Sequence, residues 1–217
     1  MDSSFLLQLF YLEEIGTQCR MARNAFNSLK NSEPTRTIQT IEKGEMQTAE
    51  VFRNVHSILT HTGVISRLLW PGNTQKSAQS KSASEDKSAS EKLRELLDLP
   101  ANGHPLCERT LRNDLEHFDE RLAKWIADVD MPPDYWQNYI SPWSVITQHG
   151  AKEQNVMRHF DPGTQIFRFQ GTPLNILEIV NSVEEMQCRV DAKHAQLMIS
   201  VKVGLSLSED KCMDDQK

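Results

Sequence analysis

The stretch FLLQLFYLEEIGTQCRMARNAFNSLK, residues 5–30, carries apolar side chains at three- and four-residue spacings along its length. That period puts them on one face of an α-helix, and an apolar helix face must be buried against another element. Pro34 ends the pattern, because proline disfavours helix in the residue before it. The stripe consists of Phe5, Leu6, Leu9, Leu12, Ile15, Cys19, Ala22 and Phe26.

The next segment supplies a partner for this helix. Residues 41–69 carry a second stripe, which Trp70-Pro71-Gly72 ends. Two helices of this length joined by a short polar turn should pack antiparallel and bury both stripes. We therefore expect a mainly α protein, built as an antiparallel bundle of four or five helices. The second stripe consists of Ile41, Val51, Val55, Ile58, Leu59, Ile65, Leu68 and Leu69.

The middle of the chain predicts a linker followed by two helices. Residues 73–90 hold seven serines or threonines and three lysines, with no apolar residue larger than alanine. Such a segment cannot bury enough surface to offset its ordering entropy, so we expect a mobile linker. A short helix over 90–97 should end near Pro100, and a longer one should span 106–129.

In the C-terminal third the pattern changes towards short strands. Residues 143–146, 156–160 and 165–169 predict strands, with a turn at Asp161-Pro162-Gly163, so we expect a small β-hairpin within 143–169. Thr172-Pro173 predicts the start of a helix that runs to about Leu197. We expect residues 1–200 to form one helical domain, with 201–217 as a frayed tail.

Composition excludes several classes of protein. The chain of 217 residues has a formal net charge of −6, which argues against coating nucleic acid through bulk electrostatics. A DNA-binding regulator ranks last, because no basic recognition helix is present. Its four cysteines are far apart without a CxxC pair, which is neither a disulfide framework nor a zinc site. The apolar start over 1–12 is too short to span a bilayer and carries Asp2, so we expect a cytoplasmic protein without a membrane contact.

The segment RTLRNDLEHFDERLAKW, residues 109–125, concentrates groups that suit phosphate chemistry. Cleaving RNA without a metal requires a base for the 2′-hydroxyl, an acid for the leaving oxygen and a cation for the phosphoryl oxygens. His117 suits the proton transfers, since the unperturbed pKa of histidine is about 6.5. Arg112 suits the phosphate through its planar fork of donors, and Asn113 can orient either partner.

Helix geometry supports part of this grouping. Asn113 and His117 are four residues apart and share a face. Arg112 and His117 lie about 140° apart around the helix, so only the length of the arginine brings its head to the same place. One copy of the motif therefore forms an incomplete site, with the arginine and the histidine on different sides of the helix. Two copies facing each other across a twofold axis would make a fuller one.

The run Arg112-Asn113-Asp-Leu-Glu-His117 resembles the signature of the HEPN superfamily, in which an arginine and a polar residue precede a histidine. Residues 65–71 and 109–125 together also resemble a group of bacterial all-helical proteins, in outline over 1–130. The resemblance implies a small α-helical domain, often dimeric, from a toxin–antitoxin or phage-defence system. It implies a metal-independent ribonuclease with the paired motifs at the dimer interface.

We therefore expect an endoribonuclease that acts on RNA and needs no metal or cofactor. We expect it to form a homodimer through the motif helix and to bind an antitoxin or a defence partner protein. By the resemblance, Arg112 and His117 are the catalytic pair, with Asn113 as the polar modulator. Substrate binding is assigned to Arg109, Glu116 and Arg121.

Two alternatives stay open. The first is structural: Arg112–Glu116 and Asn113–His117 would be ordinary helical pairs on a solvated face, above an apolar stripe. The second is functional: a non-catalytic helical module that binds a partner protein or a nucleotide.

Other polar residues are weaker candidates. Arg53 and His56 could join the site if the second helix faces the motif, although histidines at that spacing are more often half-buried surface residues. The Arg158-His159 step is expected to be exposed and inert. Trp136, Tyr139 and Trp143 could stack bases, but the absence of interleaved lysines favours a hydrophobic cap.

Overall fold

The computed structural model describes residues 3–32, 41–71, 81–108, 113, 115, 117–128 and 136–214. This part of the chain is mainly helical and carries one four-stranded sheet within residues 136–175, ahead of the last helix. The helices are α1 (Ser3–Ser32), α2 (Ile41–Leu69), α3 (Lys81–Leu96), α5 (Phe118–Asp128), α6 (Trp143–Gln148) and α7 (Ile176–Asp214), with 3-10 turns at Pro105–Cys107 and Glu153–Asn155. The strands are β1 (Trp136–Ile140), β2 (Val156–Asp161), β3 (Ile166–Phe169) and β4 (Thr172–Asn175).

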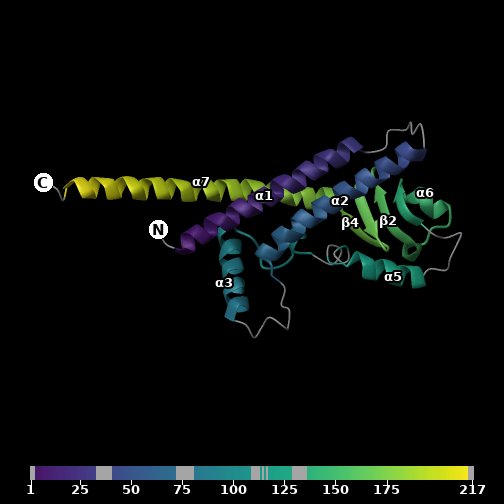
Figure 1. The fold of residues 1–217 in the computed structure, drawn as a ribbon, viewed down its shortest axis with the longest axis horizontal. Coiled ribbons are helices and arrows are strands. Elements are labelled where there is room, and N and C mark those ends of the chain that lie inside the picture. The colour runs from purple at the N-terminus through teal and green to yellow at the C-terminus, as the bar shows by residue number, and fades with distance from the viewer. Residues whose placement is uncertain are drawn as a thin grey trace.

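The helices α1 and α2 form the antiparallel pair that their apolar stripes predict (Figure 1). Near the chain reversal, the Asn54 side-chain amide donates a hydrogen bond of 3.1 Å to Ser32 Oγ. Further along, His61 Nδ1 lies 2.7 Å from Gln18 Oε1. The helix α7 then packs against α1, with His194 Nε2 at 3.5 Å from Glu13 Oε1.

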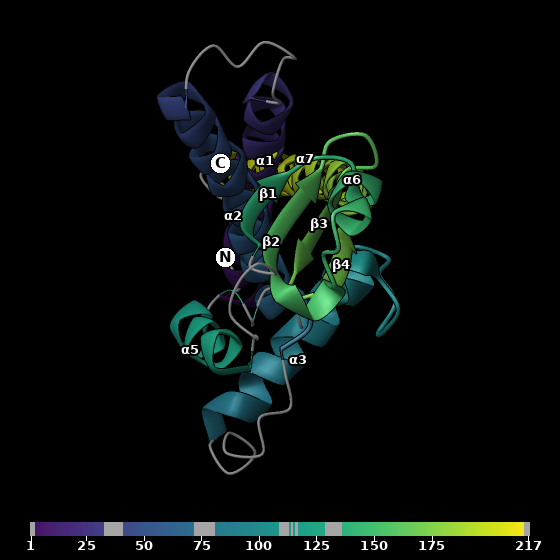
Figure 2. The same ribbon diagram turned by 90° about the vertical axis from the view of Figure 1, so that its right-hand side faces the viewer.

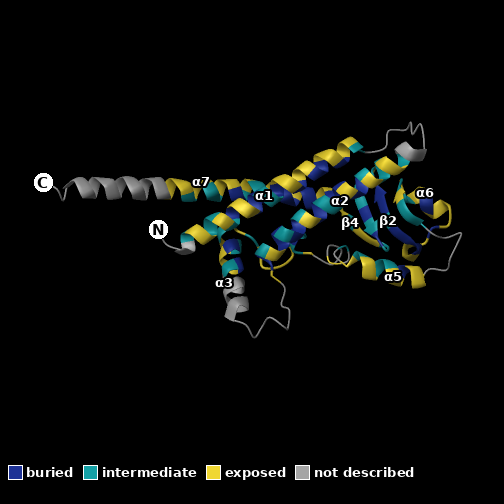
Figure 3. Cartoon of the chain, in the orientation of Figure 1, coloured by how far each residue is buried: buried dark blue, intermediate teal, exposed yellow. Residues whose placement is uncertain are grey.

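The helix α2 buries two faces instead of one. Its predicted stripe packs on α1, and a second row that includes Phe52 turns to the sheet, where the Phe52 and Phe167 ring centroids are 6.3 Å apart. Buried residues gather where α1, α2 and α7 meet the sheet (Figure 3). The mainly helical class is confirmed, but an antiparallel bundle of four or five helices is not, because the sheet takes the second side of α2.

The sheet has the order β1-β2-β3-β4, in which β1 is parallel to β2 and the other neighbours are antiparallel (Figure 2). Directly opposed residues share a face of a sheet, and successive residues alternate between its faces. Arg158 is opposite Phe169, and His159 is opposite Arg168. One face therefore carries Arg158, Phe160, Phe167 and Phe169, and the other carries His159, Asp161 and Arg168.

Different helices cover these two faces. The first face lies against α2 and α5, since Phe169 contacts the Phe118 ring at a centroid distance of 6.0 Å. The second face lies under α6, whose Trp143 ring is 4.9 Å from that of His159. Both sides of β2 are thus covered, which explains why five of its six residues are buried.

The predicted hairpin is confirmed at β2 and β3, which the turn over 162–165 connects. The strand predicted over 143–146 is wrong, because these residues begin α6. An apolar run of four residues does not distinguish a strand from a helix by its period. Here the Asp161 carboxylate accepts a hydrogen bond of 3.1 Å from the Trp143 backbone N–H and so stabilises the first turn of a helix.

The helix start predicted at Thr172-Pro173 is also wrong. These residues lie in β4, an edge strand in which the missing N–H of proline is tolerated. The helix α7 begins at Ile176, where the Asn175 side-chain oxygen caps it by accepting from the Glu178 backbone N–H at 3.1 Å. It continues to Asp214, beyond the end predicted near Leu197.

Two boundaries in the middle of the chain differ from prediction. The helix α3 begins at Lys81, so residues 81–90 of the predicted linker are helical. Leu93 near its end and Leu97 just after it are buried. The helix predicted from Leu106 does not start there: 105–107 form a 3-10 turn, which His104 caps, and Glu108 is extended. Among the described residues, no helix combines the length and apolar character needed to cross a bilayer.

Candidate functional site

The motif predicted at 112–117 is placed only in part. Residues 109–112, 114 and 116 lie outside the described residues, so Arg109, Arg112 and Glu116 have no structural account. Asn113 and His117 are described and are one helical turn apart, since the His117 backbone N–H donates to the Asn113 carbonyl oxygen at 3.1 Å. They share a face, as their spacing predicts.

The imidazole of His117 is open to solvent. Its side chain is 62% exposed, and Nδ1 lies 3.8 Å from the Glu120 carboxylate one turn later. An ion pair at this distance between exposed groups is weak. The ring is therefore accessible to an external ligand.

The backbone around Arg121 ties the motif helix to the sheet. The Arg121 N–H continues the helix by donating to the His117 carbonyl oxygen at 3.0 Å. The Arg121 carbonyl oxygen accepts a hydrogen bond of 2.9 Å from Gln170 in the β3–β4 turn. Further along α5, Trp125 is buried and its ring N–H donates to the Gln154 carbonyl oxygen at 3.0 Å. The start of α5 thus has a fixed position beside the sheet.

Phe118 connects the motif helix to a second group of polar residues. Its ring packs against Phe169 and also lies under the guanidinium of Arg158, with 4.8 Å from Arg158 Cζ to the ring centroid. Because Phe118 follows His117 directly, the predicted motif borders the strand that carries Arg158.

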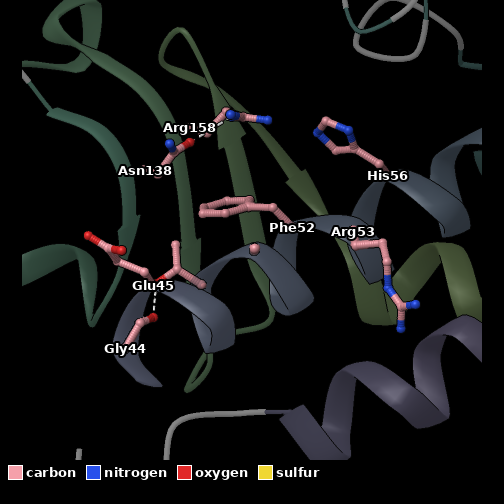
Figure 4. Close-up of a pocket in the computed structure, with 9 residues that line it drawn as sticks. Gly44, Glu45, Phe52, Arg53, His56, Asn138 and Arg158 are labelled. Atoms are coloured by element: carbon pink, nitrogen blue, oxygen red, sulfur yellow. Dashed lines mark hydrogen bonds between the residues drawn. The ribbon is translucent and has the colours of Figure 1, made fainter. Parts of the chain in front are cut away.

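Beside Arg158 lies a pocket of about 630 Å³ between α2 and the sheet (Figure 4). Residues of α2 from Gly44 to His56 line one side, and Asn138 of β1 and Arg158 of β2 line the other. Glu45 and Arg53 at its edge are exposed, so the pocket opens to solvent.

Arg158 is held rigidly at the wall of this pocket. Its Nε donates a hydrogen bond of 2.8 Å to Asn138 Oδ1, and its Cζ lies 5.4 Å from the Phe52 ring centroid. Burial lowers the pKa of this guanidinium from its ordinary value. The expectation that Arg158 and His159 are exposed is wrong, because β2 is an inner strand of the sheet and both of its faces are covered.

His56 faces the same pocket from α2. Its ring packs edge-on against Phe167 at a centroid distance of 6.4 Å, and its Nε2 is buried without a hydrogen-bond partner among the described residues. Burial, and then the positive charge of Arg158, lower the pKa of His56 to about 4. His56 is therefore neutral near pH 7. Arg53 turns away from Arg158 in Figure 4 and bonds Glu50 and Asn54 instead.

His159 belongs to the opposite face of the sheet. Its side chain is fully buried, and the N–H at Nε2 donates to the Ser141 carbonyl oxygen at 2.9 Å. The aromatic residues around it cover the sheet: the Trp136 and Tyr139 ring centroids are 4.5 Å apart, and Arg168 lies 4.3 Å above Trp143. These contacts fit the expected hydrophobic cap better than a base-stacking platform.

From the sequence, His56 was a weak candidate for the site and Arg158 was not a candidate, because it was expected to be exposed and inert. The available signal was a lone arginine in the apolar strand VMRHFD, on the same face as Phe160. In the described part of the chain, no three His, Cys, Asp or Glu side chains come close enough to hold a metal ion. Comparisons with protein-family models, with curated proteins and with solved structures found no match for this chain.

Proposed function

We propose that the protein is a metal-independent endoribonuclease of HEPN type, a toxin or phage-defence effector. The observation that carries the proposal is the solvent-exposed His117, one helical turn after Asn113 on a helix that the sheet fixes in place. An accessible imidazole on a rigid element is what proton transfer to and from a bound strand requires.

The proposed reaction is attack of a ribose 2′-hydroxyl on the adjacent phosphate. His117 takes the hydroxyl proton as the O–P bond forms and returns a proton to the departing 5′-oxygen, which leaves a 2′,3′-cyclic phosphate. Asn113 orients the imidazole or the phosphate. In the proposal Arg112 binds the phosphoryl oxygens. Arg109, Glu116 and Arg121 bind the rest of the RNA strand.

A homodimer through the motif helix completes the site in this proposal. The residues four, seven and eleven positions after His117 lie on the same side of the helix and carry charges of both signs. They are Arg121, Lys124 and Asp128. An antiparallel copy of the helix would set Lys124 of one protomer against acidic side chains of its mate. The pairing would bring two His117 rings, with their neighbouring arginines, to one cleft.

Cleavage of mixed RNA in EDTA tests the proposal. His117→Ala should lose at least about 100-fold in rate, the lower end of what general acid–base catalysis contributes. The matched control is His149→Ala, which removes an exposed histidine at the end of α6 and should cleave like wild type. Equal rates in all three proteins, or no cleavage by wild type, would rule out the ribonuclease.

A second candidate is a module that binds a nucleotide or a partner protein without catalysis. The pocket of about 630 Å³ beside Arg158 favours this function, because its size suits a small ligand. Wild-type protein that binds a nucleotide but cleaves no RNA would support the module and contradict the enzyme.

A further inference from the structure

Arg158 is a half-buried cation that lacks an anionic partner among the described residues. Its Nε bonds a neutral amide, that of Asn138, and the guanidinium lies over the rings of Phe52 and Phe118. Removing a charge from water is costly unless an opposite charge or several hydrogen bonds compensate. Cation–π contacts with Phe52 and Phe118 recover part of that cost. The remaining donors at Nη1 and Nη2 have no hydrogen-bond partner among the described residues.

Other arginines in the described regions show the contrast. Arg189 pairs with the Glu185 carboxylate at 2.8 Å and donates to the Leu97 carbonyl oxygen at 2.9 Å. Arg168 also lies over an aromatic ring, and its Nη1 is buried without a hydrogen-bond partner among the described residues. Burial lowers its pKa too, but the charges of Asp161 and Glu153 oppose that shift. For Arg158, burial alone lowers the pKa, and no described carboxylate opposes it. An external anion would supply the negative charge that no described residue provides for Arg158.

His56 adds a second nitrogen to the same pocket. Its Nε2 is buried without a hydrogen-bond partner among the described residues, and His56 and Arg158 both line the pocket. Figure 4 shows both side chains at one end of the pocket, with the Phe52 ring beside them. The acidic group on the lining, that of Glu45, comes from the other end of the α2 segment.

We propose that the pocket between α2 and the β1–β2 edge binds a phosphate group through the two Nη atoms of Arg158, with the His56 imidazole beside it on the pocket lining. The planar fork of arginine matches the oxygens of phosphate. The pocket is larger than one phosphate needs, which leaves room for the sugar or base attached to it. The source of the phosphate rests on the proposed function: the phosphate belongs to an RNA strand, one or more nucleotides away from the bond whose cleavage His117 assists.

The test measures binding and not cleavage. Wild-type protein, Arg158→Met and Arg168→Met are titrated with a short 2′-O-methyl RNA, which cannot be cleaved, and with adenosine monophosphate. Methionine keeps the apolar contacts of the arginine stem and removes its charge. Arg168→Met removes a ring-stacked arginine from the other face of the same sheet and is the matched control. The thermal unfolding midpoint of Arg158→Met should stay within about 3 °C of wild type, because an uncompensated charge is lost.

Binding of the RNA at least about tenfold weaker in Arg158→Met, with Arg168→Met unchanged, supports the inference. Inorganic phosphate should compete and acetate at equal concentration should not. Equal binding by all three proteins, or no binding by wild type, overturns it. Arg158-dependent binding of the mononucleotide alone keeps the phosphate site and contradicts the RNA strand as its source.

The two proposals fail separately. Arg158-dependent binding without any cleavage activity would refute the ribonuclease and retain the phosphate site. Cleavage that depends on His117 but not on Arg158 would support the ribonuclease and contradict the phosphate site.

Discussion

The buried histidine of β2 should make the protein lose stability in mild acid. The N–H at His159 Nε2 donates to the Ser141 carbonyl oxygen, so a second proton would have to enter at Nδ1, which is buried without a partner among the described residues. Burial, and then the charge of Arg168, lower the pKa of His159 to about 4. The unfolded chain holds this histidine near its unperturbed pKa of about 6.5.

The sign follows from proton uptake. Between these two pKa values the unfolded state binds more protons than the native state, so stability falls as the pH falls. Stability is complete above about pH 6.5, and the loss reaches its limit below the native pKa. One pKa unit corresponds to about 1.4 kcal/mol, so His159 should account for a loss of about 2 kcal/mol at pH 5 and about 3 kcal/mol at pH 4.

Urea unfolding at pH 7.5 and pH 5, followed by circular dichroism, measures this loss. His159→Gln keeps a donor for Ser141 and cannot titrate, so the difference between the two pH values should shrink by about 2 kcal/mol relative to wild type. His149→Gln, which changes an exposed histidine, should retain the wild-type difference. If wild type and His159→Gln lost the same stability between these pH values, the reasoning about Nδ1 would be refuted.

Three further outcomes are expected. Phe167→Ala should lower the free energy of unfolding by about 3–5 kcal/mol in urea titration, because the ring is fully buried between α2 and the sheet. Gly171→Ala and Gly103→Ala both place alanine at φ +81, but only at Gly171 would the new Cβ meet other atoms, at 3.0 Å. Gly171→Ala should therefore unfold with about 1 kcal/mol less free energy than Gly103→Ala, and equal values would contradict the clash. Saturating phosphate should raise the pKa of His56 by about one unit or more in an NMR titration, because an anion favours the imidazolium; an unchanged pKa would place the ligand elsewhere.

Local sequence was sufficient for the two long helices α1 and α2. The stripes of α1 and α2 run over many turns, and a period repeated that often specifies a helix and its buried face without tertiary information. The hairpin of β2 and β3 was also predictable, since Asp161-Pro162-Gly163 supplies turn residues between two apolar runs.

Short segments were not predictable because their partners are distant in the sequence. Residues 143–146 are helical in part because Asp161, far along the chain, accepts the first N–H of α6. Thr172-Pro173 has the local form of a helix start, yet pairing with β3 makes it a strand. In both cases a tertiary contact outweighs a preference worth only a fraction of a kcal/mol per residue.

The candidate site divides in the same way. The sequence alone determines that Asn113 and His117 share a helix face, because the 3.6-residue turn is a property of the backbone. Only the tertiary structure brings Arg158 of β2 to Phe52 and His56 of α2, about a hundred residues earlier in the chain. Helical period is encoded locally, whereas the neighbours of a strand residue depend on strand order and on the helix that covers that face of the sheet.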